Sequence, residues 1–342
     1  MRAIVLLATL ACACATIAEN AGGDQNLPTS GAGPFRKLAG AEVHGTAPVL
    51  LDDKTLDYRS PSALALGDGT DVALYFVVHD AGGHDVIARS RATDGRTFYG
   101  ATLDLGHHAP QVLAADQAWE GPDLAHPSVV RVASEIWLYY ASNGSIGLAK
   151  STDGLTFTKL GAPVLAQDAL GPIDSASVAV LPDGSFDMML AQAGAIYEAT
   201  STDGASFTRA GTVPVLAAGS ADESPAFDTL GVADPFLAPR VTAAGRLQVR
   251  VFYTGFAAGE AGTASSIGFA ARYGATGPLE RAPSAVYAIH KNERAPSVFE
   301  WQSGSLLYVE QDSSDATYRV LGGAVAPASI TLPLPDPYPP SP

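Results

Sequence analysis

The segment Ser151-Thr-Asp-Gly-Leu-Thr-Phe157 decides the fold, because close copies of it recur along the chain. Two of them read Ala92-Thr-Asp-Gly-Arg-Thr-Phe98 and Ser201-Thr-Asp-Gly-Ala-Ser-Phe207, so the copies are spaced by roughly fifty to sixty residues. Asp-Gly is a strong turn signal, because glycine accepts a positive φ and aspartate can bond to its own backbone. Each copy therefore predicts a tight turn, after which the aromatic residue begins a new strand.

A second element lies upstream of these turns: a short start, usually containing Pro-Ser, that leads into an apolar strand. Its five copies start at Ser60, His126, Asp174, Asp234 and Ala295. The apolar strands that follow lie at 72–78, 135–140, 186–190, 248–253 and 305–309. One four-stranded sheet cannot bury both faces, whereas five sheets stacked around a ring can. The repeat therefore predicts an all-β fold, a five-bladed β-propeller with four-stranded antiparallel blades. A β-sandwich with chance similarity between hairpins is the alternative.

The composition limits the class of partner. The chain has 342 residues, a formal net charge of −15 and 47% hydrophobic residues, which is enough for a large core. The acidic balance argues against nucleic acid, whose phosphates would be repelled. The two cysteines, Cys12 and Cys14, both lie near the N-terminus, so we expect no disulfide in the propeller. A monomer is the default expectation.

The N-terminus is typical of an export signal. Arg2 is followed by an apolar stretch at 3–11 and then by small residues, a pattern too short to span a bilayer. We expect a signal peptide at 1–18, a flexible tether at 19–46, the propeller at 47–332 and a Pro-rich tail at 333–342. The second half of the tether could pair with the propeller. The protein would then be secreted, or lie at the outer surface or in the periplasm. Small residues before Cys12 or Cys14 also resemble a bacterial lipobox, so a lipid anchor through either cysteine is the alternative.

The middle copy carries a family resemblance. Pro127-Ser-Val-Val130, Ile136-Trp-Leu-Tyr-Tyr140 and Ile146 to Phe157 resemble the five-bladed glycoside hydrolases. These are the arabinofuranosidase and β-xylosidase type of family 43, with the related fructosidases, levansucrases and mannoside phosphorylases. The resemblance covers about 55–332 and implies an active site at the axis, on the innermost strand of each blade. It implies an Asp on the first blade as base or nucleophile, an orienting Asp on the second and a Glu on the third as acid. Such chemistry needs two carboxyl groups across the glycosidic bond, one protonated and one ionised.

The motif positions of this chain depart from that pattern. The first copy holds Ser60, the second His126, and the third Asp174 in place of a Glu. The fourth keeps the Asp-Pro form at Asp234, outside the usual catalytic blades. The usual acid triad is therefore absent from its usual places.

Five carboxylates precede innermost strands and are expected to ring the mouth of one channel, as catalytic candidates. They are Asp57, Asp123, Asp174, Asp234 and Glu293. Asp174 and Asp234 are the strongest, because they occupy the motif position itself. For each of them the alternative is a turn cap at a strand start.

Candidate ligand-binding residues lie beside the same positions. Arg59, His126 and Arg294 are suited to a carboxylate or phosphate on a ligand, or to pairing with the ring carboxylates. Trp119 and Tyr58 are candidate stacking platforms for a sugar, and Glu120 follows Trp119. His107-His108 matches no metal-ligand spacing, so we expect no metal and no cofactor, with an axial Ca²⁺ ion left open.

Two functions follow from these expectations. The first is an exported, glycoside hydrolase-like protein whose axial carboxylates act on an extracellular glycan. The second is a non-catalytic glycan-binding propeller or surface lipoprotein that has lost the triad. Carbohydrate is the expected ligand in both cases.

Overall fold

The computed structural model describes the propeller and a few residues before it. The described residues are 35–37, 50–51, 57–66, 71–93, 95, 97–99, 109–220, 227–242, 244–259, 262–288, 292–301, 304–312 and 318–327. The expected signal peptide, the cysteines, the Pro-rich tail and His107-His108 lie outside them. The described part contains no helix that is long and apolar enough to cross a membrane.

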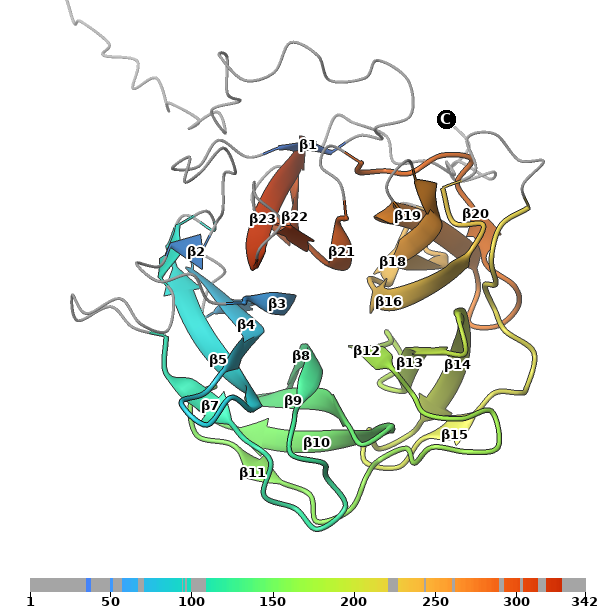
Figure 1. Cartoon of the computed structure of the whole chain (residues 1–342). Helices are drawn as coiled ribbons and strands as arrows, with labels where there is room; N and C mark the ends of the chain where they lie inside the picture. The colour runs from blue at the N-terminus through green and yellow to red at the C-terminus, as the bar shows by residue number, and fades with distance from the viewer. Residues whose placement is uncertain are drawn as a thin grey trace, which may run out of the picture.

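Five antiparallel sheets stand around a central axis (Figure 1), so the propeller prediction is confirmed and the sandwich is wrong. Blade one contains β3 (Arg59–Leu66), β4 (Asp71–His79), β5 (Asp85–Ala92) and β7 (Gln111–Leu113). Blade two contains β8 (Ala125–Val132), β9 (Glu135–Ser142), β10 (Ser145–Ser151) and β11 (Thr158–Lys159). Blade three contains β12 (Ser175–Val180), β13 (Phe186–Gln192), β14 (Ala195–Ser201) and β15 (Thr208–Arg209).

Blade four contains β16 (Gly231–Leu237), β18 (Leu247–Gly259), β19 (Gly262–Tyr273) and β20 (Glu280–Arg281). The short β17 (Arg240–Val241) also pairs with β18. Blade five contains β21 (Arg294–Trp301), β22 (Gly304–Asp312), β23 (Arg319–Pro327) and β1 (Arg36–Lys37). Outside the blades, β2 (Leu50–Leu51) pairs in parallel with β6 (Phe98–Tyr99).

The two ends of the described chain meet in blade five. β1 pairs antiparallel with β23, so the outermost strand of this blade comes from the stretch expected as a tether. Phe35, just before β1, is 2% exposed and packs edge-on against Phe252 of blade four. Burial of this ring and pairing of β1 hold the last blade to the N-terminal segment.

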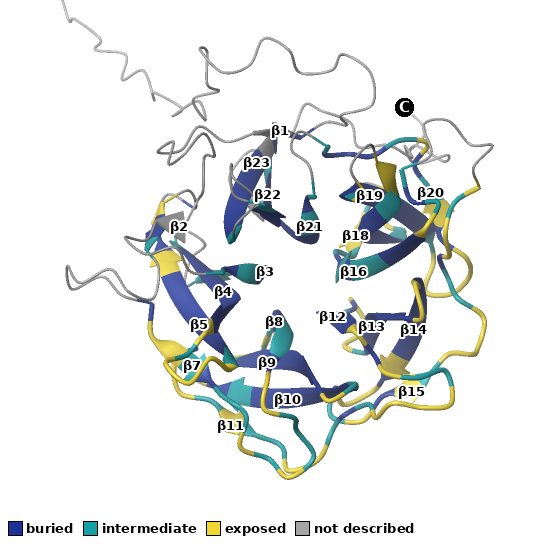
Figure 2. Cartoon of the chain, viewed as in Figure 1, coloured by how far each residue is buried: buried dark blue, intermediate teal, exposed yellow. Residues whose placement is uncertain are grey.

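The core lies between neighbouring blades, where their faces pack together (Figure 2). The second strand of each blade is the most buried; in β4, seven consecutive residues from Val72 to Val78 are buried. Such continuous apolar strands are expected where a sheet is covered on both faces. The packing therefore accounts for the apolar runs that the repeat carries.

The serine of the Pro-Ser motif links adjacent innermost strands. No ladder pairs these strands with one another in the described part of the chain, and a serine Oγ accepts a backbone N–H from the next blade instead. The bonds are Val129 N to Ser62 (3.0 Å), Val178 N to Ser128 (3.0 Å), Leu237 N to Ser177 (2.9 Å) and Ala63 N to Ser297 (3.0 Å). Phe236 replaces the serine in the fourth copy. The motif is therefore explained by inter-blade bonding.

The Asp-Gly turn forms a second link between blades. Tyr75 of blade one donates to the carbonyl of Gly154 in blade two, at 3.0 Å. Gly154 has a φ of 72°, and a Cβ there would lie 2.6 Å from the tyrosine hydroxyl. The same bond joins Tyr139 to Gly204 (2.8 Å) and Tyr308 to Gly95 (2.6 Å). Glycine is required at the turn both for its backbone angle and for this close approach.

Candidate active site at the propeller axis

A small polar pocket opens where the five innermost strands converge. Its lining includes Ser60, His126, Ser175, Asp234 and Ala295, one residue from each blade. The cavity volume is about 30 Å³, which is room for about two water molecules. The motif position of the repeat therefore builds the axial site, as the family resemblance implies.

The backbone has the same unusual conformation at four of the five motif positions. Ser60, His126, Asp234 and Ala295 have φ values of 50°, 47°, 47° and 47°. Each precedes a proline and sits at a register shift between the first two strands of its blade. Positive φ is strained for a residue with a side chain, and a following proline restricts it further. Strain of this kind is concentrated at functional sites, and here it turns four side chains toward the axis.

Residues from three blades meet at His126. The Ser60 hydroxyl lies 3.2 Å from His126 Nδ1, and Asp234 Oδ1 lies 3.6 Å from the same nitrogen. Thr254 on β18 donates to Asp234 Oδ2 at 2.9 Å and accepts the Ala295 N–H at 2.9 Å. Asp234 is therefore held in place from two sides.

This cluster is not a Ser-His-Asp catalytic triad. A triad needs the serine and the aspartate on opposite nitrogens of the ring, so that one accepts the proton while the other orients the imidazole. Here both face Nδ1. In addition, the Ser60 N–H donates to Glu310 rather than pointing into the pocket.

Asp174 is a second carboxylate near the axis, but Ser175 holds the motif position of blade three, where the sequence analysis expected Asp174. Asp174 immediately precedes β12, is exposed, and makes no side-chain hydrogen bond to any residue that the structure describes. Loss of water around it raises the pKa of Asp174; the Asp234 charge adds to this rise, and the His126 charge opposes it. The two strongest sequence candidates therefore lie in one electrostatic cluster.

Glu310 on β22 is an axial carboxylate that the sequence analysis missed. Its Oε2 accepts the Ser60 N–H at 3.2 Å, and its Oε1 lies 3.5 Å from Arg319 Nη1. Burial raises the pKa of Glu310, and the Asp234 charge raises it further, while Arg319 and His126 oppose the rise. The available signal was a charged residue at the end of the buried strand Leu306–Val309.

Of the five candidate carboxylates only Asp234 lines the pocket, so Asp57, Asp123 and Glu293 lie outside the lining, as Asp174 does. Asp57 accepts the Arg319 N–H at 2.7 Å, and Asp123 accepts the Asp85 N–H at 2.9 Å. Both thus accept a backbone N–H from a segment distant in sequence, so neither forms the local turn cap that was the alternative. Glu293 is fully buried, and its charge adds to the effect of burial in raising the pKa of Tyr287.

Two of the ligand-binding candidates, Arg59 and Tyr58, make structural contacts in blade one. Arg59 forms an ion pair with Asp85, and Tyr58 is 4% exposed and packs edge-on against Phe76. Arg59 is therefore paired internally, although with the first residue of β5 and not with one of the expected ring carboxylates. Tyr58 offers no face for a sugar.

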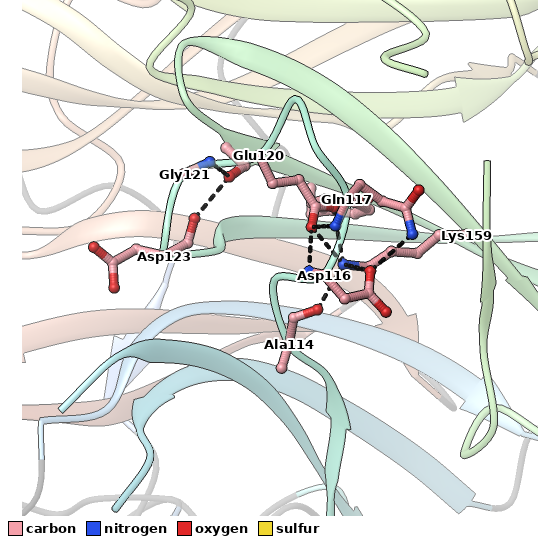
Figure 3. Close-up of polar contacts among 9 residues, drawn as sticks. Ala114, Asp116, Gln117, Glu120, Gly121, Asp123 and Lys159 are labelled. Carbon is pink, nitrogen blue, oxygen red and sulfur yellow. Dashed lines mark hydrogen bonds and ion pairs between the residues drawn. The ribbon is translucent and has the colours of Figure 1, made fainter. Parts of the chain in front are cut away.

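Glu120 and Trp119 lie in the loop that precedes β8. Hydrogen bonds from Lys159 and from two backbone amides hold Glu120 in place (Figure 3). Glu120 accepts hydrogen bonds from Lys159 Nζ (2.8 Å) and from the Tyr140 hydroxyl (2.6 Å). Burial alone would raise the pKa of Glu120, but the bonds from Lys159, Tyr140 and two backbone amides hold it below its usual value. Trp119 stacks on the Tyr140 ring at 6.0 Å. This network fixes the loop that leads into His126.

Arg294 is the first residue of β21 and directly precedes Ala295, which lines the pocket. It is half-buried, its guanidinium lies 5.8 Å from the centre of the Phe256 ring, and its Nε is 3.4 Å from Ser265 Oγ. No group of three or more His, Cys, Asp or Glu side chains within the described ranges is placed to hold a metal ion.

Comparison with known proteins places the fold. No family model matches the sequence, and no curated protein matches it. Among solved structures, a mannoside phosphorylase family (GH130) member, from a study of hydrolases that target β-1,2 mannosidic linkages in Candida mannan, superposes with a TM-score of 0.63 and 15% identity. That match covers 91% of this chain and 99% of the other.

Two further structures agree. A thermostable family-43 glycoside hydrolase has a TM-score of 0.59 and 16% identity, over 84% of this chain and 97% of its own. An endo-arabinase from Bacteroides thetaiotaomicron has a TM-score of 0.59 and 14% identity, over 85% and 99%. The chain has the fold of the five-bladed glycoside hydrolases. The resemblance seen in the repeat is confirmed at the level of the fold.

Proposed function

We propose that this protein is a carbohydrate-active enzyme that hydrolyses a glycosidic bond at the propeller axis. The observation that carries the proposal is the pair Asp174 and Asp234. Asp174 has a raised pKa and makes no side-chain hydrogen bond to a described residue, whereas Asp234 is held by Thr254 and His126. Two carboxyl groups whose surroundings differ in this way are what acid–base hydrolysis of a glycoside needs.

In this proposal Asp174 is the general acid. Its raised pKa keeps a larger share of it protonated near neutral pH, and it donates that proton to the leaving-group oxygen as the C–O bond breaks. Asp234 is the general base, which takes a proton from the water that attacks the anomeric carbon. Ser60 and His126 lie beside Asp234 and hydrogen-bond the water or the sugar. The products are two free sugars, and water supplies the added H and OH.

The proposed substrate class rests on the solved structures with this fold, and the proposed location rests on the sequence. The solved structures with this fold are described as enzymes acting on mannosides, arabinan and other glycosides, so we propose an extracellular glycan as substrate. Export through 1–18, with Cys12 or Cys14 as a lipid-anchor alternative, is proposed from the sequence, as is a monomer.

A second function has its own support. Ser60 and His126 occupy two motif positions, and the pocket measures only about 30 Å³, which is far smaller than a sugar ring needs. A propeller that binds a glycan chain across the mouth without cleaving it fits this narrow pocket.

The test is hydrolysis of nitrophenyl glycosides and natural glycans by the mature protein and its variants. We expect Asp174→Asn and Asp234→Asn each to lower kcat/KM by about 10²- to 10⁴-fold. Asp183→Asn, at an exposed turn, is the matched control and should keep full activity.

The leaving group separates an acid from a structural residue. Dinitrophenolate departs without a proton. Asp174→Asn should therefore lose far less activity on a dinitrophenyl glycoside than on a natural glycoside. Asp234→Asn should lose activity to the same extent on both substrates. Equal losses for Asp174→Asn on both substrates would remove it as the acid. No turnover by the wild type, with sugar binding detected by calorimetry, would support the binding propeller.

A further inference from the structure

We propose that the glycan carries an anionic substituent, a uronic acid carboxylate or a sulfate ester, and that Arg294 binds it at the mouth of the axial pocket. This proposal rests on the proposed function only in placing a sugar at the axis. It adds the chemical class of that sugar.

Arg294 lies next to the pocket. It is the first residue of β21, and Ala295, which follows it, lines the cavity. The Ala295 N–H bonds to Thr254, which in turn holds Asp234. Two residues, Ala295 and Thr254, and two hydrogen bonds therefore connect the Arg294 backbone to the proposed base.

The side chain of Arg294 reaches toward blade four. Phe256, under its guanidinium, pairs with Gly231 at the mouth end of β16, two residues beyond Thr254 on β18. Ser265, its weak hydrogen-bond partner, faces Phe256 across the β18–β19 hairpin. The guanidinium thus lies over the β18–β19 hairpin of blade four, next to the start of the innermost strand β16.

Arg294 differs in its partners from the other arginines of this face. Arg59 pairs with Asp85, and Arg319 pairs with Glu310 and Asp312. Arg294 has no carboxylate partner among the residues that the structure describes, although the chain carries a net charge of −15. Its terminal nitrogens have no acceptor in the same set.

Arginine at this place is suited to a planar anion. Its fork donates two parallel hydrogen bonds to a carboxylate, and an aromatic ring beneath it fixes the plane of the fork. A neutral sugar has hydroxyl groups only and needs no cation. The neighbouring acids do not prevent anion binding, because Asp234 lies beside His126 and Glu310 beside Arg319.

The experiment compares sugars that differ in charge alone. Methyl and nitrophenyl glycosides of both anomers are used as matched pairs, each a uronide and its neutral parent, with the 6-sulfate as a third member. Binding is measured by calorimetry and turnover by release of nitrophenolate, for the wild type, Arg294→Met and Arg294→Lys. Arg131→Met, at the opposite end of β8, is the control.

We expect an anionic member of a pair to bind at least about tenfold more tightly than its neutral parent. Arg294→Met should abolish that preference through KM and leave kcat and the melting temperature little changed, with Arg294→Lys restoring part of it. A uronide preferred over the sulfate identifies the carboxylate as the ligand, and the reverse identifies the sulfate.

The outcomes separate this proposal from the proposed function. Turnover of neutral sugars that Arg294→Met leaves unaltered, with no preference for an anion, would overturn the anionic substrate and leave the hydrolase standing. Arg294-dependent binding of an anionic sugar without turnover would support the proposal and count against hydrolysis. Equal loss of binding in Arg294→Met and Arg131→Met would also refute it.

Discussion

Replacing the buried Asp187 with asparagine should change how the stability of the propeller depends on pH. Asp187 on β13, Glu198 on β14 and Arg272 on β19 are sealed between blades three and four. Arg272 is bonded to both oxygens of Glu198 and lies 3.7 Å from Asp187. One cation therefore faces two carboxylates in a site that is buried from solvent. Burial, with the Glu198 charge adding to it, raises the pKa of Asp187 to about 7.

The size and sign of the effect follow from linkage. The pKa of Asp187 is about 7 in the folded chain against 3.8 as its ordinary value, so the folded protein holds this proton more tightly. At low pH the Asp187 carboxyl therefore does not reduce the free energy of unfolding, and the reduction grows as the pH rises from about 4 to about 7. At about 1.4 kcal/mol for each pKa unit, the full cost is about 4 kcal/mol, and about 3 kcal/mol of it appears between pH 5 and pH 8.

The assay is urea unfolding of the wild type and Asp187→Asn at pH 5 to 8. We expect the variant to gain stability relative to the wild type by about 3 kcal/mol across that range, seen in the unfolding midpoint at constant m-value. Asp183→Asn, an exposed carboxyl in the same blade whose hydrogen bonds lower its pKa, should leave the slope above pH 5 unchanged. Parallel curves for the wild type and Asp187→Asn would refute the reasoning.

Contacts between blades and within blade two give three further predictions. Ser128→Ala should leave the Val178 N–H buried without its acceptor and cost about 1–3 kcal/mol by urea unfolding, with unchanged secondary structure by circular dichroism. Tyr308→Phe should remove the bond to Gly95 between blades five and one, lowering stability by about 1 kcal/mol and increasing amide exchange there. Gly147→Ala would place a Cβ 2.4 Å from a tyrosine ring of β9, and the melting temperature should fall by several degrees.

The fold was predictable because each blade repeats the same solution to the same packing problem. The Asp-Gly turn must keep glycine at 154 to accept the tyrosine of the previous blade, and serine at 128 must cap the next strand. Among the described residues the tyrosine–glycine bond recurs at three blade boundaries and the serine bond at four, so these requirements leave a periodic trace in the sequence. The closing strand β1 leaves none, because a two-residue pairing depends on backbone atoms that any sequence supplies.

The candidate site was only partly predictable, and the reason lies in how side chains reach the axis. Asp234 was found because it occupies the repeated position, where the strained backbone of four blades turns the side chain toward the axis. Asp174 lies one residue before that position, which Ser175 holds in blade three. Asp57 and Asp123 were expected there from topology alone, yet each lies three residues before the repeated position and is bonded to neighbouring backbone.

Glu310 reaches the axis by a different route, which no repeat position describes. It lies on the second strand of blade five, and its contact with Ser60 joins residues 250 positions apart that become neighbours only when the ring closes. A sequence with Ser60 at the first-blade position therefore does not lack a carboxylate there, since Glu310 Oε2 sits 3.2 Å from the Ser60 nitrogen. Because blade five closes on the N-terminal segment through β1, the placement of this carboxylate depends on correct closure of the whole propeller.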